Sequence, residues 1–123
     1  MEELRGDLAA AEACHRESLR QAGDLADENS LAFALEGLAC VAAARRQPER
    51  AAVLLGAAES IRARTGSQLP LQERADVARA AGAAAGDLGR EAFDLALDRG
   101  RRMSTGEVLA QESRDMTEGR FAR

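Results

Sequence analysis

Three side chains of this sequence belong to the types that bind metal ions or act as nucleophiles, namely Cys14, His15 and Cys40. His15 is the only histidine, and it lies on an otherwise apolar helical stripe. A zinc ion needs three further ligands beside one histidine, and the sequence offers no such set. We therefore interpret His15 as a packed or partly exposed structural histidine, and we expect no metal site.

The two cysteines could form a disulfide only if their helices bring them within bonding distance. A free thiol on an alanine-rich helix face behaves as a small hydrophobic group. We therefore favour buried free thiols at Cys14 and Cys40.

Two other stretches resemble ligand-binding loops. Residues 24–29 are acidic, but an EF-hand calcium loop has twelve residues with a central glycine and a closing glutamate, which are absent here. Gly82, Gly86 and Gly89 resemble a phosphate-binding loop, but no strand precedes them and no lysine follows. We interpret the first stretch as solvated capping residues and the second as a turn.

The composition of the chain excludes several kinds of reaction. The sequence contains no lysine, tryptophan or tyrosine, so all 17 basic residues are arginine. The lack of lysine excludes a P-loop lysine, a Schiff-base lysine and a pyridoxal phosphate anchor. We therefore expect no catalytic residue and no cofactor, and we interpret the chain as an interaction module. The net charge of −4 also disfavours a nucleic-acid surface, which is usually basic.

Residues 76–97 have the spacing of a DNA-binding helix-turn-helix of the LacI type. The recognition helix would present Asp87, Glu91 and Asp94, whose carboxylates repel phosphate. DNA binding through residues 76–97 is therefore an alternative function, and a small-molecule effector pocket between helices is another.

Apolar residues recur at three- and four-residue steps through nearly the whole chain, which predicts helices and no strand. A capping box formed by Ser104 and Glu107 predicts the start of a short sixth helix. The other five helices are expected over residues 2–22, 30–45, 48–65, 71–85 and 90–100.

Glycine, proline and short polar residues mark the expected helix ends. Gly23 ends the first helix, Pro48 suits the first turn of the third helix, and Gly66 ends that helix. The expected N-cap of the second helix is Asn29 or Ser30.

The 123 residues are enough for one domain. We expect residues 1–112 to form a single helical-repeat domain and residues 113–123, which have few apolar anchors, to form a frayed tail. No apolar run approaches the ~20 residues of a membrane span. The first ten residues also lack the basic flank and apolar core of a signal peptide. These features predict a cytoplasmic chain without membrane contact.

One internal repeat is visible, because Glu17-Ser-Leu-Arg20 recurs as Glu59-Ser-Ile-Arg62. A spacing of this order indicates helical-hairpin repeats. The middle of the chain resembles a tetratricopeptide repeat, with residues 31–45 and 48–65 as its two helices. The residues that reproduce its apolar spacing are Leu35, Leu38, Ala39, Ala42, Ala51, Leu55 and Ala58. The resemblance implies an all-α fold of antiparallel hairpins of tetratricopeptide-repeat type, with five to six helices.

Over roughly residues 6–110 the chain resembles the C-terminal tetratricopeptide-like region of bacterial LuxR-type and related ATPase-containing transcriptional regulators. The segments that carry this resemblance are residues 34–39, 48–52, 54–59, 69–70, 73–75, 91–93, 100–101 and 103–104. Two residues depart from the pattern: Arg46 stands where such repeats often have glycine, and His15 stands at a normally apolar position. The resemblance implies a relay module that contacts a protein or other domains of the same regulator, without direct nucleic-acid binding.

The first helix of a tetratricopeptide hairpin lines the concave face, where partner segments usually lie. In the matched register this face would include Phe33, Glu36 and Cys40, which are the expected partner-binding residues.

The first expected helix matches the second member of a hairpin whose first member is not in the sequence. Contiguous exposed apolar surface is often covered in a two-fold dimer. We therefore expect a homodimer through Leu4, Leu8 and Ala11, unless the last three helices fold back over this face.

Overall fold

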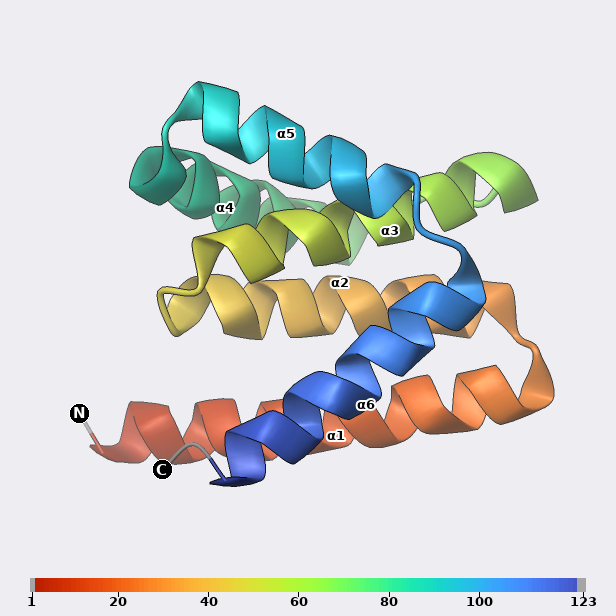
Figure 1. The fold of residues 1–123 in the computed structure, drawn as a ribbon, viewed down its shortest axis with the longest axis horizontal. Coiled ribbons are helices and arrows are strands. Elements are labelled where there is room, and N and C mark those ends of the chain that lie inside the picture. The colour runs from red at the N-terminus through yellow and green to blue at the C-terminus, as the bar shows by residue number, and fades with distance from the viewer. Residues whose placement is uncertain (1, 122–123) are drawn as a thin grey trace.

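We describe the fold from a computed structural model, which defines the backbone of residues 2–121 and the side chains of residues 7–114. This backbone contains no strand, and the all-α class is therefore confirmed for the described residues. Its six helices are α1 (Glu2–Leu25), α2 (Glu28–Ala44), α3 (Pro48–Thr65), α4 (Leu71–Leu88), α5 (Arg90–Arg101) and α6 (Thr105–Phe121) (Figure 1).

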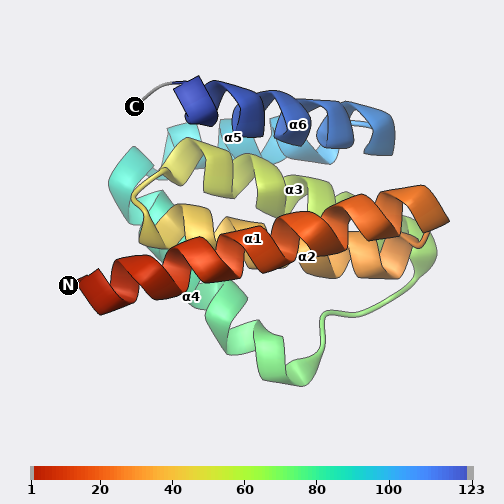
Figure 2. The same cartoon turned by 90° about the horizontal axis from the view of Figure 1, so that it is seen from below.

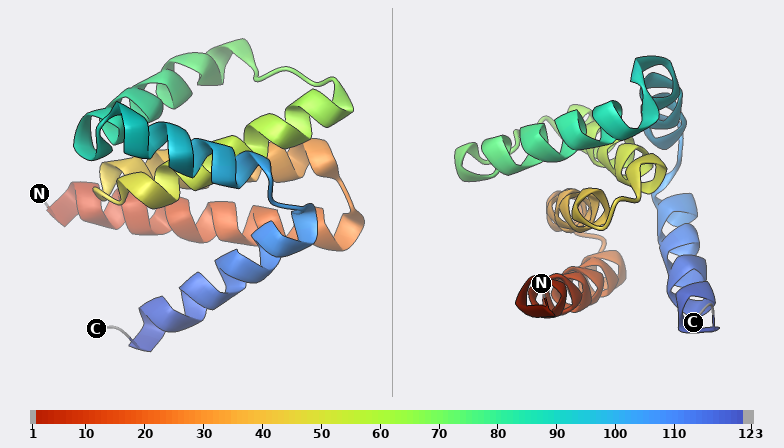
Figure 3. Two further views of the ribbon diagram at one scale, coloured as in Figure 1. Left: turned by 45° about the horizontal axis from the view of Figure 1, so that its top comes forward. Right: turned by 90° about the vertical axis from the view of Figure 1, so that its left-hand side faces the viewer.

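Four of the helices form a row. α1, α2 and α3 lie side by side and alternate in direction, and α5 packs against α3 (Figure 1). α4 lies across α2 and α3 and extends to one side of the row, as Figure 2 and the right-hand view in Figure 3 show. α6 lies on the opposite side and reaches back to α1. The two sides of the row are therefore covered by different helices.

Several helix ends agree with the local sequence signals. α3 spans Pro48–Thr65 as predicted, and Gly66 ends it with a left-handed φ of 73°. The capping box is present, because the main-chain N–H of Ser104 donates to Glu107 at 2.8 Å and that of Glu107 donates to Ser104 at 3.1 Å. Arg46, in the turn between α2 and α3, has a left-handed φ of 61°. The backbone at this position is therefore one that glycine would adopt more easily.

The predicted end of the first helix is wrong. α1 continues through Gly23 to Leu25, and a Cβ atom on Gly23 would lie 3.1 Å from Leu109 Cδ1 of α6. The glycine thus provides room for α6 and does not end the helix. The predicted N-cap of α2 is also wrong, because the N-cap is Asp27, whose carboxylate accepts a hydrogen bond from the main-chain N–H of Ser30 at 3.2 Å.

The expected turn over Gly82, Gly86 and Gly89 is confined to its last glycine. Gly82 and Gly86 lie inside α4, and only Gly89, with a φ of 89°, separates α4 from α5. Alanine, the best helix former, surrounds the first two glycines, so the helix tolerates their low helix propensity. α4 consequently extends three residues beyond its predicted end at residue 85.

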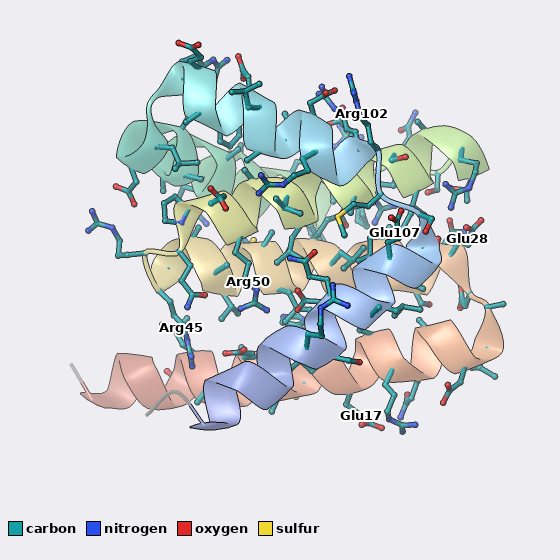
Figure 4. All side chains as sticks on the ribbon, in the orientation of Figure 1. Glu17, Glu28, Arg45, Arg50, Arg102 and Glu107 are labelled. Atoms are coloured by element: carbon teal, nitrogen blue, oxygen red, sulfur yellow. The ribbon has the colours of Figure 1, made fainter. Side chains whose placement is uncertain are left out.

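α6 is held to the row by a buried carboxylate that the sequence analysis did not single out. Arg50 of α3 reaches toward α6 (Figure 4) and donates to Glu112 Oε1 at 2.7 Å. Arg16 of α1 donates to the main-chain carbonyl oxygen of Glu112 at 3.1 Å. The helix continues to Phe121, so much of the segment 113–123 is helical, while its fraying stays a prediction. Residues 122 and 123 lie outside the described part of the chain.

The core is built mainly from small side chains on α2 and α3. All residues from 51 to 58 are buried, and six of these eight positions hold alanine, glycine or valine. The largest fully buried side chains are Leu31, Leu35 and Leu38, which lie on one stripe of α2. Small side chains bury little area each, but they let helix axes approach closely.

α3 and α5 meet through their backbones at two glycines. A Cβ atom on Gly56 would overlap the carbonyl oxygen of Leu97, and one on Gly100 would overlap the carbonyl oxygen of Val53. A backbone atom cannot rotate away as a flexible side chain can. Any larger residue at Gly56 or Gly100 must therefore push the two helices apart.

We expect Gly56→Ala and Gly100→Ala each to lower the free energy of unfolding by about 1–3 kcal/mol, the usual cost of overpacking. Gly82→Ala is the matched control, because a Cβ atom there meets nothing within 4 Å. Alanine is the better helix former, so the control should gain up to about 1 kcal/mol. Urea unfolding followed by circular dichroism measures all three changes. A gain in stability from either Gly56→Ala or Gly100→Ala would contradict the close backbone contact between α3 and α5.

Candidate functional site

A groove of about 500 Å³ runs along α2 between α1 and α4, and we call it the α2 groove. Residues of α1 and α4 form its two walls, and in the right-hand view of Figure 3 these two helices lie on either side of α2. Its lining brings together residues that the sequence analysis assigned to two different surfaces. They are Leu8 and Ala11 from the expected dimer face, and Phe33, Glu36 and Cys40 from the expected partner face. The side chain of Leu4 lies outside the described residues.

The floor of the groove is a stripe on α2. It includes Phe33, Gly37, Cys40 and Ala44, which recur at steps of three and four residues and span three turns, roughly 16 Å of helix. Gly37 adds no side chain at the middle of the stripe, and Phe33 is 44% exposed. The floor is therefore elongated and largely apolar, and Gly37 leaves room on it for a side chain from a neighbouring helix.

The imidazole of His15 packs on the floor at Gly37. A Cβ atom on Gly37 would overlap the ring, so the glycine creates the space that the histidine fills. Partial burial lowers the pKa of His15 from its ordinary value of 6.5, while the nearby carboxylate of Glu73 acts in the opposite direction. Burial therefore disfavours the charged form of His15, and its ring forms part of the lining of the groove.

The two cysteines are free and differ in exposure. Cys40 is half-buried in the groove, and burial is the main reason that its pKa lies above the ordinary thiol value, with additional contributions from Asp76 and Glu73. Cys14 is exposed on α1, so the expectation that both thiols are buried is wrong for Cys14. α1 packs mainly against α2, with a smaller contact to α6, and Cys14 lies on the part of its surface that neither helix covers.

Glu36 forms an ion pair that the sequence analysis did not predict. Arg62 of α3 donates to both of its carboxylate oxygens, at 2.6 and 2.7 Å, and also to the main-chain carbonyl oxygen of Gln68 at 3.1 Å. This pair joins α2, α3 and the segment that leads to α4. The pKa of Arg62 is raised, because its hydrogen bonds to Glu36 stabilise the charged form. Glu36 therefore has a structural role in addition to its place in the lining.

The wall formed by α4 was missed by the sequence analysis. It presents Glu73, Asp76, Val77 and Ala80, which recur at helical steps. Asp76 pairs with the exposed Arg79. The sequence predicts a helix here, with DNA binding through residues 76–97 as an alternative, and the helical spacing of these four residues is the signal that could have identified a groove wall.

Two ion pairs join the walls to the C-terminal end of α2. Arg45 points toward α1 (Figure 4), where its Nη1 lies 3.0 Å from Glu12 Oε1. Arg46 Nε lies 2.8 Å from Asp87 Oδ2 of α4. Exposed pairs of this kind contribute at most about 1 kcal/mol each. Their positions show that this end of the groove lies near residue 12 of α1 and residue 87 of α4.

Comparisons with protein families, with curated proteins and with solved structures give no match to this chain. In the described part of the chain, no helix combines the length and apolar character that crossing a membrane requires. Among the same residues, no group of three or more His, Cys, Asp and Glu side chains is arranged to hold a metal ion. The α2 groove is therefore interpreted from its own geometry.

Removing the carboxylate of Glu36 should destabilise the protein strongly. The side chains of Glu36 and Arg62 are only 8% and 11% exposed, so Glu36→Gln leaves a mostly buried guanidinium without its counter-charge. The expected loss in the free energy of unfolding is about 3 kcal/mol. Glu59→Gln is the matched control, because its pair with Arg101 also joins two helices but is 55% and 43% exposed. The control should change the free energy of unfolding by less than about 1 kcal/mol in urea unfolding. Equal losses for Glu36→Gln and Glu59→Gln would show that burial does not make the Glu36–Arg62 pair more important.

The single histidine allows a direct measurement of the groove environment. We expect its NMR titration to give a pKa below 6.5, and Glu73→Gln to lower the pKa further because the carboxylate stabilises the imidazolium. The unfolded chain, with a pKa near 6.5, then binds more protons between the two values. The contribution of His15 to stability is therefore present above pH 6.5 and declines as the pH falls toward the folded-state pKa. A pKa at or above 6.5 would contradict the burial of this ring.

Proposed function

We propose that this chain is a noncatalytic helical-repeat module that binds the apolar face of a helix in the α2 groove. The bound helix belongs to a partner protein or to another domain of the same regulator. The observation that carries the proposal is the elongated, largely apolar stripe on α2, flanked by α1 and α4 over three helical turns. Helix-in-groove recognition uses apolar anchors at steps of three and four residues, which match such a stripe.

The wider context of the proposal comes from the resemblance to LuxR-type regulators. A tetratricopeptide-type arrangement is supported by the adjacent antiparallel pair α2 and α3 and by the glycine-like backbone at Arg46. In this proposal the module works in the bacterial cytoplasm and relays a signal to transcription through protein contacts. The carboxylates of the groove favour a protein partner over the phosphates of DNA.

A small-molecule effector is a second candidate ligand for the same groove. Its volume of about 500 Å³ lies within the range of ligand pockets. A thermal-shift screen of metabolites tests this candidate, because a ligand that binds only the folded state raises the melting temperature. The elongated shape of the stripe favours the helix as the principal proposal.

The helix proposal is tested with a neutral amphipathic helical peptide that carries leucines at positions i, i+4, i+7 and i+11. Bound peptide should slow the alkylation of Cys40, which lies in the groove, and should leave that of the exposed Cys14 unchanged. Mass spectrometry resolves the two sites within one protein. Peptide at saturating concentration that protects neither cysteine, or both equally, would overturn the proposal.

Variants locate the bound peptide. Phe33→Ala removes the large exposed apolar side chain of the floor and should weaken binding about tenfold in fluorescence anisotropy. Leu95→Ala is the control, because Leu95 is also exposed but lies on α5 outside the groove. Leu95→Ala should leave the affinity unchanged.

A further inference from the structure

The charges in the α2 groove are not balanced. Its lining contains the carboxylates of Glu36, Glu73 and Asp76, and Arg79 is its only basic side chain among the described residues. Glu36 is neutralised by Arg62, and Asp76 by Arg79. The carboxylate of Glu73 forms no ion pair with any residue that the structure describes, so the groove keeps a net negative charge.

The other titratable groups of the groove do not offset this charge. Glu73 faces His15 across the groove, but partial burial of the imidazole lowers the pKa of His15 and disfavours its charged form. The thiol of Cys40 is neutral, since burial and the nearby carboxylates raise its pKa. No group in the lining therefore pairs with Glu73, and a ligand could do so.

The negative charge is confined to one half of the groove. Glu73 and Asp76 lie in the first two turns of α4, beside His15 and Cys40. The other half, near the Arg46–Asp87 pair, is lined by small apolar side chains, among them Ala44 and Ala83. A complementary helix needs an apolar stripe along most of its length and a positive charge near one end.

From this complementarity we infer that the α2 groove selects a partner helix whose apolar stripe ends in an arginine or lysine, and that Glu73 binds this cationic side chain. The inference rests on the proposed function and specifies its partner. It makes Glu73 a specificity-determining residue, since apolar contacts hold any amphipathic helix while Glu73 discriminates by charge. An anionic helix would meet an unpaired carboxylate and lose affinity.

The test uses three helical peptides with the same leucine stripe, which end in arginine, glutamine or glutamate. Binding is measured by fluorescence anisotropy, and protection of Cys40 from alkylation locates the peptide. We expect the arginine peptide to bind at least about fivefold more tightly than the glutamate peptide, the effect of one partly exposed charge pair. Raising the salt concentration should reduce the ratio, because screening weakens the pair.

Glu73→Gln should bring the three affinities together without changing that of the glutamine peptide. The matched control is Glu91→Gln, because Glu91 also lies in the first turn of its helix, α5, but outside the groove. The inference would be overturned if the three peptides bound the wild-type protein equally, or if Glu73→Gln left the affinity ratio of the arginine and glutamate peptides unchanged. Either result would leave the proposed function in place. Failure of all three peptides to protect Cys40 would overturn both.

Discussion

The backbone contacts of Gly56 with Leu97 and of Gly100 with Val53 set how closely α5 lies against α3, and the position of α4 depends on them. α4 is joined to α5 through Gly89 alone, so the two helices cannot be placed independently. At its other end, α4 follows the segment that Arg62 holds through the carbonyl oxygen of Gln68. α4 is one wall of the α2 groove, whereas α3 and α5 contribute no residue to its lining. The backbone contact between α3 and α5 therefore influences the shape of the groove indirectly, through the position of α4.

The chain uses buried arginine–carboxylate pairs where many domains use large aromatic side chains. Aromatic residues make up only 2% of the sequence, and an alanine-rich core leaves few bulky groups to define how the helices align. Glu36 with Arg62 aligns α2 against α3, and Glu112 with Arg16 and Arg50 aligns α6 against α1 and α3. A buried pair contributes little net stability but strongly penalises arrangements that separate its charges. These pairs therefore specify the arrangement more than they stabilise it.

Local signals in the sequence were sufficient to predict six helices but not all of their ends, and contacts between distant residues were not visible in them. Pro48, Gly66 and the Ser104 capping box act within one turn, so their effect could be predicted. Gly23 and Gly56 have the same local character as a terminating glycine, but their role depends on Leu109 and Leu97, far away in the sequence. The same limit applies to the groove, where the helical register placed Phe33 and Cys40 correctly on α2 but could not show that Glu36 meets Arg62 or that α4 forms the facing wall.

The expected dimer face and the expected partner face are parts of one surface. Leu8 and Ala11 of α1 line the same groove as Phe33 and Cys40 of α2, so a helix bound in the groove covers both. A second copy of the chain and a partner helix would therefore compete for this surface. Such competition couples the two equilibria by mass action, so each ligand reduces the apparent affinity of the other. The charge of the groove biases this competition toward the ligand that places a cationic side chain beside Glu73.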